Sequence, residues 1–304
     1  MATSEKAGGP APKARPGRPA TSIDPSFPNY PTLVHALAAA AARAPDRTAL
    51  VCGDTAISYA EYVRAAAGLA RELGPLGAAG SRVVVMMGNG IETAVAQMGV
   101  MAARAQMAPL NPAFTPRELA PLVKDAEPCA IVCDAAAAAK ARAVAAEAGV
   151  AHVLAFEPGG LDLRRWTGRA DLALPDPLPG PDDWATLPYT GGTTGRPKGA
   201  AHRHSNIVWF FRQILSLWNV GFDDNVFLNV APMFHIWGFQ FATWVPIYTR
   251  STLVIVPHYK PDDVLAALEK HKVTVFAGGP PTVYSGLLGA ERFARTDLTH
   301  LKYC

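Results

Sequence analysis

The residues best suited to chemistry are residues 189–199, which read YTGGTTGRPKG. Glycine has no side chain to obstruct the backbone, so successive N–H groups can turn inward and form a concave anion-binding surface. The threonine hydroxyls add donors and Lys198 adds a full positive charge; a charged hydrogen bond to phosphate contributes about 1.5–3 kcal/mol. The segment therefore predicts a loop that holds a polyphosphate. Its donors are Thr190, Gly191, Gly192, Thr193, Thr194, Gly195, Lys198 and Gly199.

Two other interpretations of this loop fit the residues less well. An ordinary glycine-rich hairpin accounts for the glycines, but not for the paired threonines or for a lysine placed directly after Pro197. A Walker A loop has the pattern GxxxxGK[ST], in which glycine directly precedes lysine. Here Arg196 and Pro197 stand between the last loop glycine and Lys198. Gly199 then occupies the position of the magnesium-binding hydroxyl. The segment therefore disfavours a kinase or GTPase mechanism.

The composition is that of a globular protein with a large core. Of the 304 residues, 50% are hydrophobic and 17% are charged, which predicts one large or two ordinary domains. The formal net charge is +3, the basic residues are scattered, and no basic cluster is flanked by aromatic residues. This pattern argues against a nucleic-acid partner.

The four cysteines indicate reduced thiols in a cytoplasm rather than disulfides. Cys129 and Cys133 lie four positions apart in PCAIVCD, a predicted strand in which they share one face and pack as small hydrophobic side chains. No second pair of cysteines and no partner histidine completes a zinc site. We therefore predict no metal ligand and a cytoplasmic location.

No segment is predicted to span a membrane. The most apolar run, residues 207–218, is about twelve residues long and contains Arg212, whereas a spanning helix needs about twenty. Residues 1–28 are rich in proline, glycine, alanine and basic residues and lack a continuous apolar stretch. They are predicted to be a disordered tail rather than a secretory signal. Their low acidic content also permits a transit peptide, which we favour less.

The elements that must position the loop alternate between helices and strands. Residues 82–88 and 130–134 are apolar runs bounded by turn residues, which is typical of strands covered on both faces. Ser58 and Thr115 are each followed three residues later by glutamate, the pattern of a capping box at the start of a helix. The alternation predicts an α/β fold with a largely parallel sheet over residues 29–304.

Residues 157–188 interrupt this alternation. They are rich in proline, glycine and aspartate and show little periodicity, so they predict a long connection at the surface. After the loop the predicted elements are a helix over 205–218, strands over 225–232 and 251–257, a helix over 261–270, a strand over 273–278, a helix over 281–288 and the start of a strand at 301–304.

The loop resembles, nearly residue for residue, the phosphate loop of the AMP-forming acyl-CoA synthetases and their adenylate-forming relatives, such as the 4-coumarate–CoA ligases. That family has an aromatic residue, a hydroxyl residue and then [SG]GTTGxPKG, a pattern that residues 189–199 satisfy throughout. His204 and Asn206 fit the family's HxN at the start of the following helix, and APMFHIWGF at 231–239 fits its next motif. The resemblance covers residues 30–304, and its segments occur in the family's order.

The resemblance implies the layered αβαβα N-terminal domain of the adenylate-forming enzymes, incomplete and without their small C-terminal domain. It also implies a two-step reaction. A carboxylate attacks the α-phosphate of ATP to give an acyl-adenylate and pyrophosphate, and a thiol, usually coenzyme A, then displaces AMP. ATP, Mg²⁺ and coenzyme A are the implied cofactors, and a charged cradle with Mg²⁺ suits this chemistry. By matching position, the residues that hold the β- and γ-phosphates are Thr190, Gly191, Gly192, Thr193, Thr194, Gly195 and Lys198.

The motif MFHIW suggests the substrate. The resemblance places His235 where acyl- and aryl-CoA ligases line the acyl pocket. Amino-acid-adenylating domains usually have an aspartate there to pair with the substrate ammonium, so histidine favours a simple carboxylic acid, fatty or aryl. Trp237 is predicted to shape or gate this pocket. Two plainer interpretations stay open: a hydrogen-bonded histidine at the end of a strand, and a packed aromatic side chain.

The sequence departs from the family by ending before several of its motifs. The adenine-binding segment, the YGxTE motif, the ribose-binding aspartate and the catalytic lysine of the C-terminal domain are expected beyond Cys304, so no catalytic residue is assigned within this chain. We therefore expect a truncated synthetase that by itself binds triphosphate weakly and catalyses little.

Other classes of function stay open. The chain could be a non-catalytic nucleotide- or acyl-binding module, or half of an enzyme that a second polypeptide completes. An unrelated P-loop hydrolase would need a magnesium-binding carboxylate after a strand. Asp223 and Asp224 lie in a predicted turn, which fits that requirement poorly.

Overall fold

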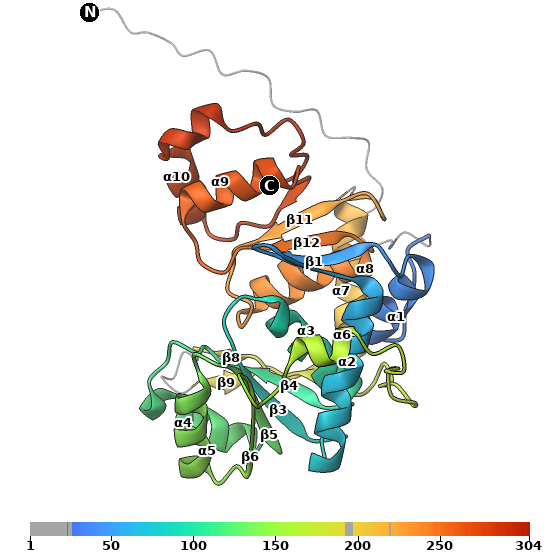
Figure 1. Cartoon of the computed structure of the whole chain (residues 1–304), viewed down its shortest axis with the longest axis vertical. Coiled ribbons are helices and arrows are strands. Elements are labelled where there is room, and N and C mark those ends of the chain that lie inside the picture. The colour runs from blue at the N-terminus through green and yellow to red at the C-terminus, as the bar shows by residue number, and fades with distance from the viewer. Residues whose placement is uncertain (1–22, 24–25, 192–196, 219) are drawn as a thin grey trace, which may run out of the picture.

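The computed structural model of the chain describes residues 23, 26–191, 197–218 and 220–304 (Figure 1). Most of the tail predicted at residues 1–28 therefore lies outside the described residues. The described part contains two largely parallel sheets, with helices between them and on their outer faces (Figure 1). Within it, no helix combines the length and the apolar character needed to cross a bilayer.

The first sheet has the strand order β13-β11-β12-β1-β2. Its strands are β1 (Thr48–Cys52), β2 (Thr55–Ser58), β11 (Val226–Asn229), β12 (Thr252–Ile255) and β13 (Val275–Phe276). All pairings are parallel except that of β2 with β1. Tyr303 forms an isolated parallel bridge with Val275 at the β13 edge, so the further strand predicted at 301–304 is a single bridge here.

The second sheet has the strand order β10-β7-β4-β3-β5-β6. Its strands are β3 (Arg82–Met86), β4 (Gln106–Pro109), β5 (Ala130–Asp134), β6 (His152–Phe156), β7 (Trp184–Thr186) and β10 (His202–Arg203). β10 is antiparallel to β7, and the other pairings are parallel. A separate antiparallel pair consists of β8 (Tyr189–Thr190) and β9 (Lys198–Gly199).

The described helices lie in three layers. Their bounds are α1 (Leu33–Arg43), α2 (Tyr59–Leu73), η1 (Gly74–Leu76), α3 (Ile91–Ala102), α4 (Pro116–Ala126), α5 (Ala138–Ala148), α6 (Leu163–Thr167), α7 (His204–Leu217), the π-helix η2 (Trp237–Thr243), α8 (Trp244–Tyr248), α9 (Pro261–Lys270), α10 (Pro281–Leu288) and η3 (Glu291–Arg295).

Two outer helix layers each cover the exposed face of one sheet. Leu119 and Val123 from α4 pack with Val84 and Ile131 of the second sheet. On the first sheet, α9 and α10 form an equivalent apolar cluster with β11 and β12. Because both faces of each sheet are covered, the central strands are apolar throughout.

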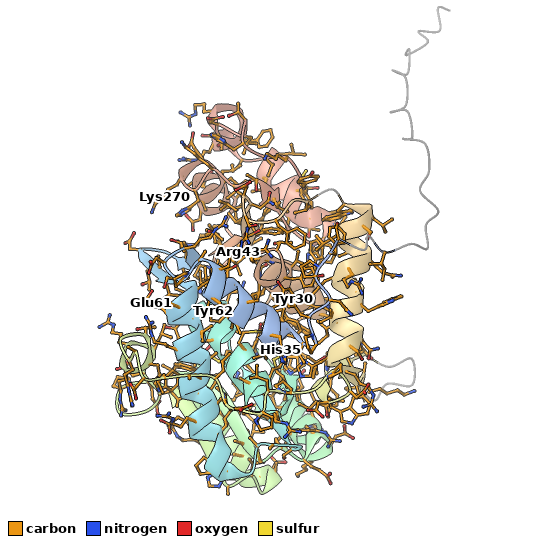
Figure 2. The ribbon with its side chains drawn as sticks, turned by 90° about the vertical axis from the view of Figure 1, so that its right-hand side faces the viewer. Tyr30, His35, Arg43, Glu61, Tyr62 and Lys270 are labelled. Carbon is orange, nitrogen blue, oxygen red and sulfur yellow. The ribbon has the colours of Figure 1, made fainter. Side chains whose placement is uncertain are left out.

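The middle layer lies between the two sheets and contains α1, α2, α3, α7 and α8. The hydroxyl of Tyr62 on α2, labelled in Figure 2, donates to the carbonyl of Ala94 on α3 over 2.9 Å. A Cβ atom at Gly99 would lie 2.8 Å from the Cβ of Leu69, so glycine allows α2 and α3 to approach closely. Together with the outer layers, this arrangement gives the αβαβα order that the resemblance implies.

Local start signals at two helices are confirmed. Ser58 and Glu61 form a capping box at the start of α2, with distances of 2.7 and 3.3 Å. Thr115 and Glu118 form another at α4, with Pro116 in the first helical position. Each box satisfies two backbone N–H groups that have no partner inside the helix.

Two regions differ from the sequence-based expectation. The connection predicted at residues 157–188 contains α6 and the strand β7, and Trp166 is only 6% exposed. Its proline and glycine residues obscure the periodicity, but Trp166 anchors it against Gly68 of α2. Residues 237–248 form η2 and α8, which no periodic pattern indicated because nearly every side chain there is buried.

Candidate functional site: the phosphate hairpin and the acid segment

The described ends of the predicted phosphate loop, β8 and β9, form an antiparallel strand pair at the carboxyl edge of the second sheet. β7 runs parallel to β4, so the chain leaves β7 at the edge where parallel α/β sheets usually bind ligands. Tyr189 pairs with Gly199 and Thr190 pairs with Lys198. We call residues 189–199 the phosphate hairpin.

The root of the phosphate hairpin is fixed by two contacts. The Tyr189 hydroxyl donates to the Asp125 carboxylate over 2.6 Å. Burial and this hydrogen bond raise the pKa of the phenol, so Tyr189 stays protonated and remains the donor. A Cβ atom at Gly199 would lie 2.8 Å from Cδ1 of Leu187, so a larger residue there would displace the returning strand.

The rest of the described hairpin is open. Thr190, Gly191 and Lys198 are exposed, and a Cβ atom at Gly191 would meet no atom within 4 Å. The remaining predicted phosphate ligands, which are Gly192, Thr193, Thr194 and Gly195, lie outside the described residues. An exposed lysine beside a hydroxyl and an unobstructed glycine backbone is suited to a polyphosphate.

The second predicted motif leaves the carboxyl end of β11 in the first sheet. We call residues 229–243 the acid segment. Its first residue, Asn229, is fully buried and accepts from the backbone N–H of Ala231 over 2.7 Å. Its amide donates to the carbonyl of Gly238 and to the hydroxyl of Thr243, both over 3.3 Å. These bonds tie the start of the segment to η2.

His235 lies exposed in this segment, between β11 and η2. Its Nδ1 accepts from the backbone N–H of Trp237 over 3.3 Å. In the neutral ring the proton therefore lies on Nε2, which leaves a donor for a ligand. His235 is thus hydrogen-bonded through one ring nitrogen, which agrees with the plainer interpretation, while its exposed ring keeps the other nitrogen available.

Trp237, the first residue of η2 in the acid segment, lies against the turn before α10. Its indole stacks on Phe241 with ring centroids 4.5 Å apart and an interplanar angle of 25°. On another side it lies against Gly279, where a Cβ atom would be 3.6 Å from the indole. Trp237 is 37% exposed, so it is packed on two sides and remains available at the surface.

Phe239, Phe241 and Trp244 follow in the sequence but are core residues, with exposures of 0%, 3% and 0%. Trp244 donates from Nε1 to the side chain of Gln97 on α3 over 2.7 Å. Of the aromatic side chains in and just after the acid segment, Trp237 is therefore better placed than these three to meet a ligand.

The carboxyl edges of the two sheets meet at Asn89, in the turn after β3. Its amide donates to the carbonyls of Ala231 and Val256, over 3.1 and 3.4 Å. These carbonyls follow β11 and β12 of the first sheet. The edge that carries the phosphate hairpin therefore adjoins the edge that carries the acid segment.

His204, the first residue of α7, is buried near the amino end of β7, where its backbone N–H donates to the carbonyl of Asp183 over 3.2 Å. It is 0% exposed, and neither ring nitrogen has a hydrogen-bond partner among the described residues. Burial lowers the pKa of this imidazole to about 4. The sequence motif HxN identified this position but not its burial; Asn206 accepts from the N–H of Arg203 over 2.9 Å at the start of the helix.

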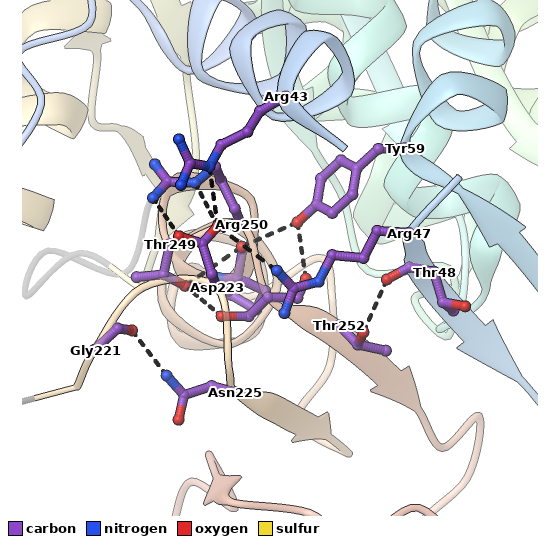
Figure 3. Close-up of polar contacts among 12 residues, drawn as sticks. Arg43, Arg47, Thr48, Tyr59, Gly221, Asp223, Asn225, Thr249, Arg250 and Thr252 are labelled. Atoms are coloured by element: carbon purple, nitrogen blue, oxygen red, sulfur yellow. Dashed lines mark hydrogen bonds and ion pairs between the residues drawn. The ribbon is translucent and has the colours of Figure 1, made fainter. Parts of the chain in front are cut away.

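Asp223 belongs to a structural ion cluster at the opposite, amino edge of the first sheet (Figure 3). Arg250 donates to both its carboxylate oxygens over 2.7 and 2.8 Å, and Arg43 and Arg47 lie 3.7 and 3.6 Å away. The bond from Arg250 holds the pKa of Asp223 below its ordinary value. A carboxylate neutralised in this way is unsuited to magnesium, which disfavours the P-loop hydrolase.

The described residues of the candidate site fit in part ATP, the nucleotide that the family resemblance implies. Lys198 and Thr190 fit the phosphates of ATP through charge and hydrogen bonding. Asp125, the carboxylate bonded to the hairpin, is engaged by Tyr189, and the described residues contain no group of three or more histidine, cysteine or acidic side chains suited to a metal. We assign no ligand for Mg²⁺ among them.

Comparison with known proteins identifies relatives of this chain by sequence. The chain is 26% identical over 306 residues to a long-chain-fatty-acid–CoA ligase of Bacillus subtilis, covering 90% of this chain and 54% of that protein. It is 30% identical over 259 residues to a feruloyl-CoA synthase of Amycolatopsis sp, covering 85% and 50%. The chain thus spans about half the length of these curated relatives.

A solved structure of similar fold is the N-terminal domain of FACL13 from Mycobacterium tuberculosis. The TM-score is 0.81 at 24% sequence identity, over 90% of this chain and 68% of that one. The family model for AMP-binding enzymes matches residues 37–304, which include both the phosphate hairpin and the acid segment. The chain therefore belongs to the AMP-binding enzyme family.

Proposed function

We propose that this chain supplies the triphosphate-binding and acid-binding parts of an acid–CoA ligase. In the proposed reaction, a carboxylate oxygen of the acid attacks the α-phosphorus of ATP and pyrophosphate leaves. The thiol of coenzyme A then attacks the acyl carbon of the adenylate, and AMP leaves. The observation that carries the proposal is the exposed phosphate hairpin at a sheet edge that adjoins the acid segment.

Lys198 is the central residue for the nucleotide. Its side chain is exposed next to Thr190 across the hairpin, so it can approach a phosphate without a prior rearrangement of the core. A charged hydrogen bond of this kind contributes about 1.5–3 kcal/mol. When bound, Mg²⁺ would neutralise part of the phosphate charge; this chain would supply the lysine charge, the hydroxyls and the backbone N–H groups.

His235 and Trp237 are the proposed contacts of the acid. The neutral His235 ring can donate from Nε2 to a carboxylate, and it provides no fixed negative charge for a substrate ammonium. Trp237 offers an apolar face that is partly exposed. A simple carboxylic acid with a fatty or aryl group fits these two side chains better than an amino acid does.

The proposal assigns no catalytic residue within the chain. Binding of ATP and acid is attributed to described residues and to the adjoining hairpin residues. Cys52, Cys129, Cys133 and Cys304 are free thiols, which favours the cytoplasm as the compartment of this reaction.

The test has two stages on the purified 304-residue chain. Calorimetric titration with Mg·ATP measures binding, and carboxylate-dependent exchange between ATP and pyrophosphate, with fatty and aryl acids, measures adenylate formation. Lys198→Ala should weaken Mg·ATP binding about 10- to 100-fold. Lys260→Ala, which removes another exposed lysine, is the control and should bind normally.

Each outcome has a defined meaning. Exchange that depends on an acid supports the proposed reaction in this chain, and binding without exchange supports the binding role alone. Equal affinity of Mg·ATP for the wild type and Lys198→Ala would exclude the role given to Lys198. A wild type that binds neither Mg·ATP nor acid would overturn the proposed function.

A further inference from the structure

The acid segment is held largely by side chains from the other sheet. Between the end of β11 and the start of η2, residues 230–236 form no strand or helix that spans the segment, so their backbone groups need partners elsewhere. Two amide side chains, Asn89 and Gln97, supply several of them. Both belong to the second sheet's side of the molecule: Asn89 follows β3 and Gln97 lies in α3.

Asn89 pairs with the segment as one peptide group pairs with another. Its side-chain oxygen accepts from the backbone N–H of Met233 over 2.8 Å. Its amide nitrogen lies 3.1 Å from the carbonyl oxygen of Ala231, with those of Val230 and Val256 farther away at 3.5 and 3.4 Å. An amide is the only ordinary side-chain group with a donor and an acceptor in this arrangement.

Gln97 completes the contact from inside the core. Its amide nitrogen donates to the carbonyl of Met233 over 2.9 Å, and its oxygen accepts from Nε1 of Trp244. Gln97 is 1% exposed and Met233 and Trp244 are 0% exposed. The N–H and the carbonyl of Met233 are therefore both bonded to amide side chains, that of the part-buried Asn89 after β3 and that of the buried Gln97 on α3.

This contact bears directly on His235, two residues further on. The N–H of His235 donates to the carbonyl of Pro232 over 2.9 Å, which links His235 to the residue next to Met233. A shift of Met233 would therefore move the imidazole that faces solvent. We propose that Asn89 and Gln97 are positioning residues, which set the place of His235 relative to the second sheet and hence to the phosphate hairpin.

The relevance of this placement to catalysis rests on the proposed function, but the placement itself can be measured without any substrate. The signal of His235 is followed by NMR in protein labelled with ¹³C at the histidine rings, and it is assigned by its loss in His235→Gln. Asn89→Ala removes both bonds and should move this signal by more than its linewidth. Asn225→Ala is the matched control.

Asn225 is a suitable control because it too is a side-chain amide bonded to backbone. It donates to the carbonyl of Gly221 over 2.7 Å at the amino end of β11 and is 5% exposed. Its loss should lower stability without moving the His235 signal. A mere loss of stability is thereby distinguished from a loss of positioning.

Asn89→Asp should regain the wild-type position of His235 at low pH. A purely structural role of Asn89 would not produce such a recovery. The new carboxylate accepts from Met233 but cannot donate, and it faces the carbonyls of Val230, Ala231 and Val256. The neighbouring carboxylates of Asp134 and Glu92 add like charge, while His235 and His258, on the segments after β11 and β12, are the nearby basic groups. The introduced carboxyl group should therefore have a raised pKa and should regain its donor when protonated.

The expected result is a displaced His235 signal in Asn89→Asp at about pH 8 that returns toward the wild-type position at about pH 5.5. The wild type is measured at both pH values for comparison. In Asn89→Ala the His235 signal should stay displaced at both. Gln97→Glu tests the second positioning residue in the same way. It is used in place of Asn89→Ala if that variant does not fold. Wild-type His235 signals in the folded Asn89 and Gln97 variants at every pH would overturn the proposal.

A second readout separates this proposal from the proposed function. Hexanoate and benzoate are titrated into each variant while the His235 signal is followed. If neither acid perturbs the wild-type signal, the acid-binding function fails, whereas the positioning proposal is still decided by the signals without acid. If the wild type responds, Asn89→Asp should respond only at the lower pH.

Discussion

The phosphate hairpin and the acid segment both follow the carboxyl end of a strand, yet they are held in different ways. Most of the described part of the hairpin is exposed, and the root is held by the Tyr189–Asp125 hydrogen bond and by the close approach of Gly199 to Leu187. The backbone of the acid segment is bonded to two buried amide side chains. One is that of Asn229, within the segment, and the other is that of Gln97, on α3. One region is fixed at its base and the other along its length.

The proposed function offers a reason for this difference. Backbone N–H groups and a long lysine side chain can adapt to a polyphosphate, and a loop that binds and releases it is expected to have few tertiary contacts. An imidazole that must face a carboxylate needs a fixed place, which requires a supported backbone. The contrast predicts that substitutions in the acid segment act mainly on stability and those in the hairpin act mainly on binding.

The largest expected effect comes from Gly238→Ala in the acid segment. A Cβ atom there would lie 1.9 Å from the carbonyl oxygen of Pro232, and that carbonyl is itself bonded to His235. Alanine's better helix propensity, about 1 kcal/mol, cannot offset a clash with fixed backbone. We expect a loss of about 3 kcal/mol or more in the free energy of unfolding, measured by urea denaturation.

Gly191→Ala is the matched change in the hairpin. No atom lies within 4 Å of the added Cβ, so the free energy of unfolding should stay within about 0.5 kcal/mol of the wild type. The affinity of Gly191→Ala for Mg·ATP should fall, because the added methyl group obstructs the approach of a phosphate to the backbone N–H groups of the hairpin. Equal losses of stability in the two glycine variants would contradict the comparison.

The next effect concerns His204, at the start of the helix that follows the hairpin. The folded imidazole has its pKa lowered from 6.5 to about 4 by burial. As the pH falls through this window, the unfolded chain takes up a proton before the folded protein does, so the free energy of unfolding decreases. At about 1.4 kcal/mol per pH unit, the decrease reaches about 3 kcal/mol near pH 4.

Replacing His204 by leucine should remove this part of the pH dependence. Unfolding free energies of the wild type and His204→Leu are compared by urea denaturation between about pH 7 and about pH 4.5. His152→Leu, at an exposed position, is the control and should keep the wild-type slope. The same slope in all three proteins would show that His204 is not a neutral buried group.

The smallest effect is expected at the root of the hairpin. Tyr189→Phe removes the bond to Asp125, and a hydrogen bond of this kind, at a partly exposed site, is worth about 0.5–1.5 kcal/mol. Stability should change little, whereas Mg·ATP affinity should fall a few-fold because the hairpin is less well fixed. Tyr259→Phe, which also loses one hydroxyl bond, serves as the control in the same titration; a matching fall there would argue against a specific role of Tyr189.

Sequence reasoning identified the features that depend on neighbouring residues. The capping boxes at Ser58 and Thr115 and the helix at 261–270 lie where the sequence places them. The glycine and lysine pattern of the hairpin is likewise local, and the resemblance that it carries agrees with the family match over residues 37–304. Caps, turns and apolar periods are decided within a few residues of one another, so the sequence displays them directly.

The composition of the sequence was misleading where burial overrides it. Residues 157–188 read as a surface connection, but Trp166 is packed in the core and β7 joins the second sheet. The helices at 237–248 have apolar residues on every side and so show no period. Such segments take their conformation from the layers that surround them.

The sequence by itself determined the α/β alternation and the helix starts, and it contains the pattern at residues 189–199 that predicts phosphate binding. The tertiary structure alone decided that the acid segment is held by Asn89 and Gln97. It also decided that the ring of His204 is buried with no hydrogen-bond partner among the described residues. The physical reason is separation along the chain. Gln97 and Met233 are 136 residues apart, and a single amide forms such a bond only after two sheets have packed and excluded water between them.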